Sequence, residues 1–142
     1  MEKENISPKE MENILNKKSG LMAISEMAPD FRHIENMSYE QEKAKLAIQV
    51  FTEKVAEYIS RYAAKMSGID AIVFTGGIGE NQIKVRESIC KRLTFMGVEL
   101  DEDINNVKSE EVKISKDNSK VAVYVIPTDE EYMIAKDTIS LI

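Results

Sequence analysis

The chain has 142 residues and a net charge of −6, with hydrophobic residues at 43% and charged residues at 31%. This composition is ordinary for a folded globular domain. The negative net charge argues against nucleic-acid binding, because a protein that binds nucleic acid needs a concentrated basic face. No apolar run approaches the roughly 20 residues of a membrane span, the charged residues 1–5 do not form a secretory signal, and the single cysteine, Cys90, excludes an internal disulfide. We therefore expect one cytoplasmic domain over residues 1–142, with no nucleic-acid and no membrane partner.

Four helices are predicted from their start and stop signals. Ser7-Pro8-Lys9-Glu10 is typical of a capping box with proline at the first helical position, and this helix should end near Gly20. Ser38-Tyr39-Glu40-Gln41 predicts the start of a long helix that Gly68 ends. A third helix is expected from Asn81 to Met96, and a fourth from Thr128 to the end of the chain. The apolar stripe of the long helix consists of Ala44, Ala47, Ile48, Phe51, Val55, Ile59, Tyr62, Ala63 and Met66.

Two strands are predicted between these helices. Residues 71–75 and 121–126 are nearly continuous apolar runs, which is typical of parallel strands buried on both faces. Residues 98–100 and 112–114 alternate and are expected to form short outer strands. The element order predicts a three-layer α/β fold, with the two long strands adjacent and parallel and with helices on both faces of the sheet. Two confident strands are few for a sheet, so the chain is interpreted as part of a domain whose first strands precede Met1.

The strongest local signal is Phe74-Thr75-Gly76-Gly77-Ile78-Gly79-Glu80-Asn81, where a buried strand meets a helix. Glycines allow a ligand to approach the backbone closely, and a helix N-terminus presents unpaired N–H groups. The string is neither a P-loop nor a G-x-G-x-x-G motif. The residues alone therefore leave a phosphate or nucleotide site and a plain tight turn equally open.

Two further strings carry polar groups. Ile126-Pro127-Thr128-Asp129-Glu130-Glu131 follows the second strand, and carboxylates in a first helical turn favour a well-capped helix over a Mg²⁺ ligand at the sheet edge. The second string is Asp30-Phe31-Arg32-His33, which could bind a ribose or an adenine. A surface turn with a local ion pair is the simpler interpretation. Cys90 is interpreted as a small buried hydrophobe.

Together these strings resemble the acetate kinase family, in order and in spacing. Phe-Thr-Gly-Gly-Ile-Gly-Glu-Asn, Asp-Phe-Arg and Ile-Pro-Thr-Asp-Glu-Glu all have counterparts there, and the resemblance covers essentially the whole chain. It implies a ribonuclease-H-like lobe of the acetate-and-sugar-kinase, Hsp70 and actin superfamily, and ATP-dependent phosphorylation of acetate to acetyl phosphate. Propionate and butyrate kinases are related alternatives.

The resemblance also implies site residues, cofactors and partners. Asp30, Phe31 and Arg32 would contact the adenosine of ATP or ADP, and Glu130 would be the Mg²⁺-linked glutamate, with Glu131 beside it. The adenine and phosphate side would be lined by Gly77, Ile78, Gly79, Glu80 and Asn81. Members of the family pair through this lobe, which implies a homodimer.

The chain departs from the family pattern at a few positions. His33 replaces a usual acid, Asp129 replaces a usual Asn, and residues 23–29 lack two expected glycines. The family's N-terminal lobe, with its Asn, Arg, Asp and His groups and its phosphate loop, has no counterpart between Met1 and Ile142. No catalytic residue apart from the metal ligand is therefore expected here. Two interpretations remain: one part of an enzyme whose N-terminal lobe is supplied separately, or a non-catalytic nucleotide-binding or dimerisation module.

Overall fold

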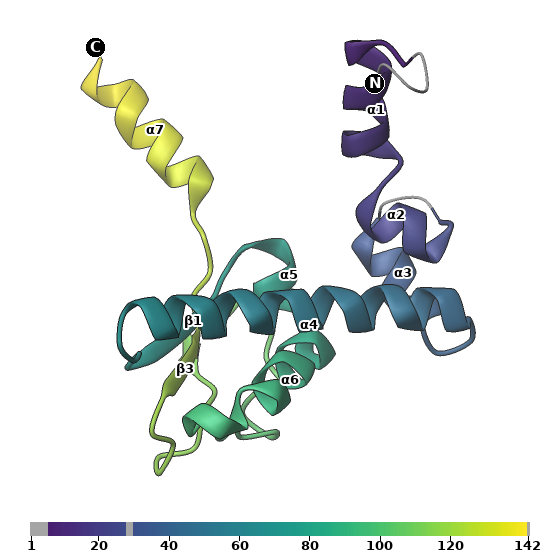
Figure 1. The fold of residues 1–142 in the computed structure, drawn as a ribbon. Coiled ribbons are helices and arrows are strands. Elements are labelled where there is room, and N and C mark those ends of the chain that lie inside the picture. Colours follow the sequence, from purple (N-terminus) through teal and green to yellow (C-terminus); the bar gives the residue numbers. More distant parts are fainter. Residues whose placement is uncertain (1–5, 28–29, 142) are drawn as a thin grey trace. The chain divides into compact units, whose positions relative to one another are not determined.

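The structure is a computed structural model that describes residues 6–27 and 30–141. Residues 1–5, Ala28, Pro29 and Ile142 lie outside the described residues. The chain divides into two compact units, residues 1–57 and 58–142. The N-terminal unit holds α1 (Pro8–Lys17), α2 (Gly20–Ser25) and α3 (Phe31–Met37) (Figure 1). The long helix α4 (Glu42–Lys65) runs through the division between the units.

The N-terminal unit is helical, and its small core lies where α3 meets the start of α4. Ile34, Ala44 and Ala47 are buried, with partly buried Leu21, Ile24, Met27, Met37 and Ile48 packed against them. The rings of Phe31 and Phe51 meet edge to face with their centroids 4.9 Å apart. This geometry is the favoured one for aromatic pairs and joins α3 to α4.

The C-terminal unit is a mixed α/β structure around a three-stranded sheet. Its strands are β1 (Ala71–Phe74), β2 (Val112–Lys113) and β3 (Ala122–Val125), in the order β1-β3-β2. Its helices are α5 (Gly76–Asn81), α6 (Ile83–Arg92), a 3₁₀ turn (Thr94–Met96) and α7 (Glu130–Ser140). β1 and β3 lie side by side and parallel, as predicted, whereas β2 pairs antiparallel with β3 (Figure 1).

Several helix predictions hold and others are wrong. Ser7 caps α1 with a complete capping box, as predicted. Ser38, by contrast, does not start the long helix: it is the C-cap of α3, and its hydroxyl donates to the carbonyl of Glu35. The predicted third helix is broken into three pieces, because Gln82 (φ −98°, ψ 84°) leaves the helical region and Leu93 ends α6. The helices α2 and α3 were not predicted.

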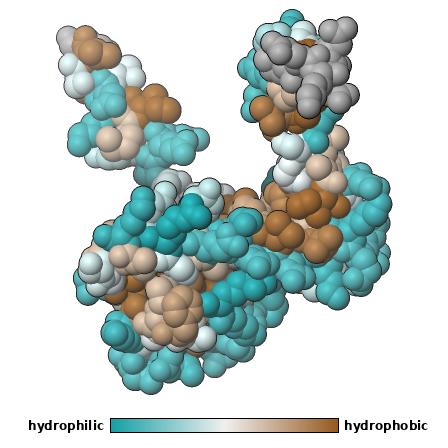
Figure 2. All heavy atoms as spheres, in the orientation of Figure 1, coloured by the Kyte–Doolittle hydropathy of each residue, from teal (hydrophilic) through white to brown (hydrophobic). Residues whose placement is uncertain are grey.

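Burial around the sheet also differs from the prediction. In β1, Ile72 and Phe74 are buried while Ala71 and Val73 are exposed, so the strand is covered on one face and not on both. Helix α7 has no buried residue, contrary to the prediction that it packs on the sheet. Figure 2 shows hydrophobic side chains at the surface of this helix. The exposed large hydrophobic residues of α7 are Tyr132, Met133, Ile134 and Ile139. Within the described chain, no helix is long and apolar enough to cross a membrane.

Candidate functional site

Two of the predicted site segments emerge at the same edge of the sheet. Phe74, the last residue of β1, pairs with Val125, the last residue of β3, in parallel register. The glycine-rich string follows β1 at once, and residues 126–131 follow β3. Open α/β sheets bind ligands outside the carboxyl ends of their strands. The two segments therefore occupy the edge where a ligand site is expected in such a sheet.

The glycine-rich string is a short helix, where the sequence predicted a turn that leads into one. Helix α5 spans Gly76–Asn81, and three of its six residues are glycine. Glycine is less favourable than alanine in a helix by about 1 kcal/mol per residue. Helix α5 therefore depends on contacts with the rest of the chain for its conformation.

The need for glycine differs among the three glycine positions of α5. Gly76 has φ +69°, a region that residues with a Cβ rarely adopt. At Gly79 a Cβ would lie 3.1 Å from the backbone carbon of Phe74, so glycine allows α5 to pack closely on the end of β1. Gly77 has neither constraint, because a Cβ there would have nothing within 4 Å among the described residues. The open space beside Gly77 is thus not required by packing within the chain.

Glu80 ties the ends of β1 and β3 together. Its side chain is buried, and Oε1 accepts hydrogen bonds from the backbone N–H groups of Gly76 (2.8 Å) and Thr128 (2.9 Å) and from the Thr128 hydroxyl (3.1 Å). The hydrogen bond from the Thr128 backbone is the largest influence on the pKa of Glu80 and lowers it, against the opposing effect of burial. The Glu80 carboxylate therefore holds together the segments that follow β1 and β3. The Gly76 N–H already donates to this carboxylate.

Arg86 is a central residue of this region that the sequence analysis did not identify. It lies on α6 and is fully buried, and its five N–H donors make five hydrogen bonds. Nη1 donates to the carbonyls of Gly79 and Glu80, both at 2.9 Å. Nε donates to Oδ1 of Asn105 (2.8 Å), while Nη2 donates to the carbonyls of Asn105 (2.7 Å) and Val107 (2.8 Å). Burial lowers the pKa of Arg86, but a guanidinium remains charged at physiological pH.

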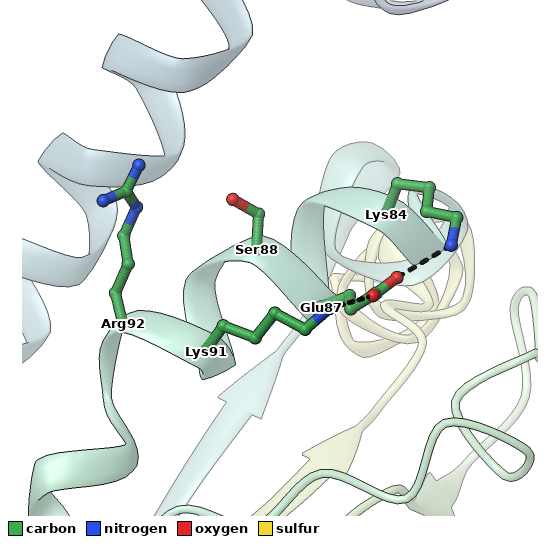
Figure 3. A pocket seen from close by; sticks show the side chains of 5 residues that line it. All are labelled: Lys84, Glu87, Ser88, Lys91 and Arg92. Atoms are coloured by element: carbon green, nitrogen blue, oxygen red, sulfur yellow. Dashed lines mark hydrogen bonds and ion pairs between the residues drawn. The ribbon is translucent and has the colours of Figure 1, made fainter.

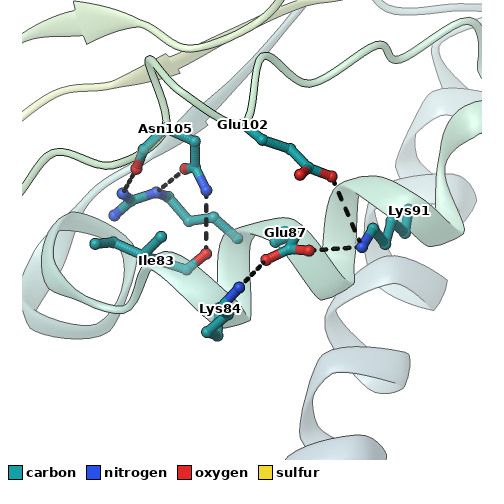
Figure 4. A network of polar contacts seen from close by, with 7 residues as sticks. Ile83, Lys84, Glu87, Lys91, Glu102 and Asn105 are labelled. Carbon is teal, nitrogen blue, oxygen red and sulfur yellow. Dashed lines mark hydrogen bonds and ion pairs between the residues drawn. The ribbon is translucent and has the colours of Figure 1, made fainter.

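Residues 105–109, which we call the bracing segment, hold α5 from the other side. The Asn105 amide also donates to the carbonyl of Ile83, so this side chain joins the bracing segment to the start of α6 (Figure 4). The backbone N–H of Ser109 donates to the carbonyl of Glu80, and its hydroxyl donates to Oδ1 of Asn81. The C-terminal carbonyls of α5 are thereby satisfied by groups outside the helix.

Glu130 is the first residue of α7, on the same sheet edge. Asp129 caps this helix by accepting from the backbone N–H of Tyr132 at 3.0 Å. Glu130 is exposed, and no cluster of three or more metal-ligating side chains occurs among the residues described. Mg²⁺ is usually held by one or two carboxylates together with water and substrate phosphates. Glu130, an exposed carboxylate at the strand ends, fits that pattern.

Asp30, Phe31 and Arg32 belong to the N-terminal unit and have local partners there. Asp30 caps α3 by accepting from the backbone N–H groups of Arg32 (3.0 Å) and His33 (3.4 Å). Phe31 is buried, while the Arg32 side chain is 80% exposed and lies 3.8 Å from Asp30. The predicted ion pair is present, but it sits at a helix start and not in a simple turn. The proximity of these residues to α5 remains a prediction.

Two surface hollows in the C-terminal unit are lined by residues of α6, and one of them also by residues of the segment 102–106. One is lined by Lys84, Glu87, Ser88, Lys91 and Arg92 (Figure 3). Glu87 accepts from Lys84 at 2.9 Å and from Lys91 at 2.5 Å, so both lysines there are paired with it. A second hollow beside it includes Glu102, Asp103 and Asn105. The candidate site lies at the strand ends and not in these hollows, because none of the predicted site residues lines them.

Comparisons with known proteins identify the fold and the family. The mixed α/β fold is shared with acetate kinases: the crystal structure of the Porphyromonas gingivalis enzyme matches with a TM-score of 0.89 and 43% identity, over 99% of this chain and 36% of that one. A propionate kinase structure from Francisella tularensis matches with a TM-score of 0.83 and 36% identity, over 96% of this chain and 35% of that one.

The sequence comparisons agree. The profile of the Acetokinase family matches residues 1–136, and the chain belongs to this family. Acetate kinase from Treponema denticola is 53% identical over 100% of this chain and 36% of that protein. The chain thus spans about a third of the length of the curated relatives it matches, and the family assignment from the glycine-rich, Asp-Phe-Arg and Ile-Pro-Thr strings is confirmed.

Proposed function

We infer that this chain supplies the adenine-nucleotide- and Mg²⁺-binding part of an acetate kinase, which phosphorylates acetate with ATP to give acetyl phosphate and ADP. The observation that carries this proposal is the open space beside Gly77. A glycine that weakens its helix, with neither a strained φ nor a close neighbour, is expected where a ligand approaches the backbone. The Glu130 carboxylate follows the adjacent strand end on the same edge.

In this proposal the residues of α5 and the start of α7 divide the nucleotide between them. Gly77, Ile78, Gly79 and Asn81 line the adenine and phosphate side, and Glu80 holds α5 against Thr128. Glu130 holds hydrated Mg²⁺, which neutralises charge on the phosphates when it is bound. Asp30, Phe31 and Arg32 contact the adenosine. Propionate remains a second candidate substrate, because a propionate kinase shares the fold.

The binding experiment is a titration of the isotopically labelled 142-residue chain with ATP·Mg²⁺, followed by ¹⁵N–¹H NMR. We expect shifts of the Gly77, Ile78 and Gly79 amides, with a dissociation constant nearer millimolar than micromolar, or roughly −4 kcal/mol. Gly77→Ala should weaken binding about tenfold or more, because a methyl group fills the space where the ligand approaches. Gln49→Ala, on the exposed face of α4, is the control and should bind normally. Shifts confined to other residues would refute the proposed site.

Catalysis is proposed to require the remainder of the acetate kinase sequence, because this chain matches only 36% of its relative. The chain alone should therefore form acetyl phosphate about a thousandfold or more below the rate of a complete enzyme. Mixing it with the remaining part of the Treponema denticola enzyme should restore turnover. Glu130→Ala should abolish that restored activity, whereas Asp137→Ala, with the same charge change on the same helix, should not. Robust turnover by the chain alone would contradict this division of labour.

Self-association is part of the same proposal. It is supported by exposed apolar side chains on α7 and by β1, which lies at the end of the sheet order and has one described strand neighbour. Open strand edges and exposed apolar patches favour association. Sedimentation of a dilution series should show dimers or larger species, and a clean monomer at all concentrations would count against a homodimer.

A further inference from the structure

The conformation of α5 presents a physical problem that the rest of the chain must solve. Half of this six-residue helix is glycine, and Thr75 at its N-cap makes no side-chain cap. A helix this short leaves most of its backbone groups without intrahelical partners. Its orientation is nevertheless what decides where the amides of Gly77 and Ile78 point.

We propose that Arg86 is the positioning residue for this glycine-rich helix: its buried guanidinium fixes α5 from the C-terminal end and so presents the Gly77 and Ile78 amides to the nucleotide. The inference rests on the proposed nucleotide site. Arg86 does not touch that ligand in this role, because its five donors are all directed at protein oxygens.

The geometry of the guanidinium explains why arginine is needed. One nitrogen, Nη1, holds the last-turn carbonyls of Gly79 and Glu80, and the other two hold Asn105 and Val107 of the bracing segment. The planar fork thus clamps two separate backbone segments in a fixed relation. A lysine carries its three donors on one nitrogen and cannot span both groups of acceptors.

The charge of Arg86 also favours its positioning role at the end of α5. All five hydrogen-bond acceptors of the Arg86 guanidinium are neutral oxygens, and two of them are carbonyls at the C-terminal end of α5. A cation is favoured at a helix C-terminus. A buried charge is stable only when its hydrogen bonds are complete. Arg86 therefore cannot easily give up its hydrogen bonds to the Gly79 and Glu80 carbonyls.

The experiment compares Arg86→Lys with Arg92→Lys in the whole 142-residue chain. Arg92 is an exposed arginine on the same helix, so this control makes the same chemical change outside the clamp. Amide hydrogen exchange without nucleotide is measured first. In Arg86→Lys, residues 77–82 should exchange about tenfold or more faster while Val123 and Val125 keep their protection. Arg92→Lys should match the original chain.

The ATP·Mg²⁺ titration is the second readout. Arg86→Lys should weaken the ATP-induced shifts of Gly77 and Ile78 about tenfold. Unchanged hydrogen exchange in α5 would overturn the positioning role, and so would an equal loss of protection in α5 and β3. Unchanged ATP affinity in a variant whose α5 exchanges faster would also overturn it. If the original chain shows no ATP-induced shift at α5, the proposed function fails, while the exchange result still decides whether Arg86 fixes the helix.

Ser109→Ala is the second variant, in case Arg86→Lys does not fold. It removes only the exposed hydroxyl contact to Asn81 Oδ1 at 3.1 Å. A smaller acceleration of exchange, confined to α5, is expected because the bracing segment holds the same helix end. No change in Ser109→Ala, together with an unfolded Arg86→Lys, would overturn the proposal that this clamp acts locally on α5.

Discussion

Glu80 and Thr128 are 48 positions apart, yet Oε1 of Glu80 accepts hydrogen bonds from both the backbone N–H and the hydroxyl of Thr128, at 2.9 and 3.1 Å. With the third bond from Gly76, this one oxygen joins the segment after β1 to the segment after β3. The sheet edge therefore carries a built-in connection between the glycine-rich helix and the Glu130 segment.

Acid should weaken this connection. The hydrogen bond from the Thr128 backbone lowers the pKa of Glu80 in the folded chain. A group with a lowered folded pKa stabilises the fold above its unfolded pKa, about 4.3 for glutamate, and loses that contribution as the pH falls through the folded value. Urea unfolding across the acidic range should show a shallower loss of stability for Glu80→Gln than for the original chain. Glu131→Gln is the exposed control, and identical pH profiles for Glu80→Gln and the original chain would contradict this role.

Gly79 and Gly77 should respond oppositely to alanine. In Gly79→Ala the new Cβ would press on the Phe74 backbone, which is buried and held in the sheet by Ile126. Overpacking costs of about 1–3 kcal/mol should exceed the helix gain of about 1 kcal/mol, so the melting temperature should fall. Gly77→Ala should raise it by the equivalent of roughly 0.4–1 kcal/mol. Calorimetric melting of both variants tests this. A higher melting temperature for Gly79→Ala would show that the β1 backbone can shift to make room for the new Cβ.

Asp30 should contribute to stability through its cap. Asp30→Ala removes the acceptor for Arg32 and His33 at the start of α3, and loss of such a cap costs about 1 kcal/mol. Asp30→Asn retains a capping oxygen and should unfold at nearly the same urea concentration as the original chain. If Asp30 also contacts adenosine through its charge, Asp30→Asn should bind ATP more weakly without loss of stability. Equal stability of Asp30→Ala and the original chain would contradict the cap.

Cys90 should be unreactive in the folded chain. Burial raises the pKa of its thiol to about 12, and the thiolate is the reactive form. Alkylation near neutral pH should therefore follow unfolding, with a rate that rises with urea. Because the unfolded thiol releases its proton at a lower pH, stability should also decline as the pH rises above roughly 8.5. Fast alkylation without denaturant would show that the α6 face opens locally.

The parallel pair of strands was predictable because Ile72, Val73 and Phe74 form an apolar run with a counterpart at residues 121–126. The sequence does not reveal which face of that pair stays open, since an apolar run looks the same covered or uncovered. Helix α7 was misjudged for a similar reason: its apolar side chains predict packing, but the described residues offer them no partner.

The glycine-rich string was recognisable because its glycines are local. Glu80 and Arg86 were not recognised as supports because their partners are distant in sequence. Arg86 nevertheless left one signal: it lies on the same helical face as the buried Ile89, Cys90 and Leu93, where an arginine is out of place. A charged residue in phase with an apolar stripe predicts a buried polar network.

The partners of Arg86 also bear on the order in which the chain can assemble. Its bonds to Asn105 and Val107 span 19 and 21 positions, against 7 and 6 for Gly79 and Glu80. When the chain is synthesised from its N-terminus, the glycine-rich segment and α6 emerge before the oxygens that complete the clamp. Until residue 107 is available, the guanidinium must remain in water, and α5 lacks its C-terminal support. The glycine-rich helix should thus be among the last parts of this unit to acquire its native shape.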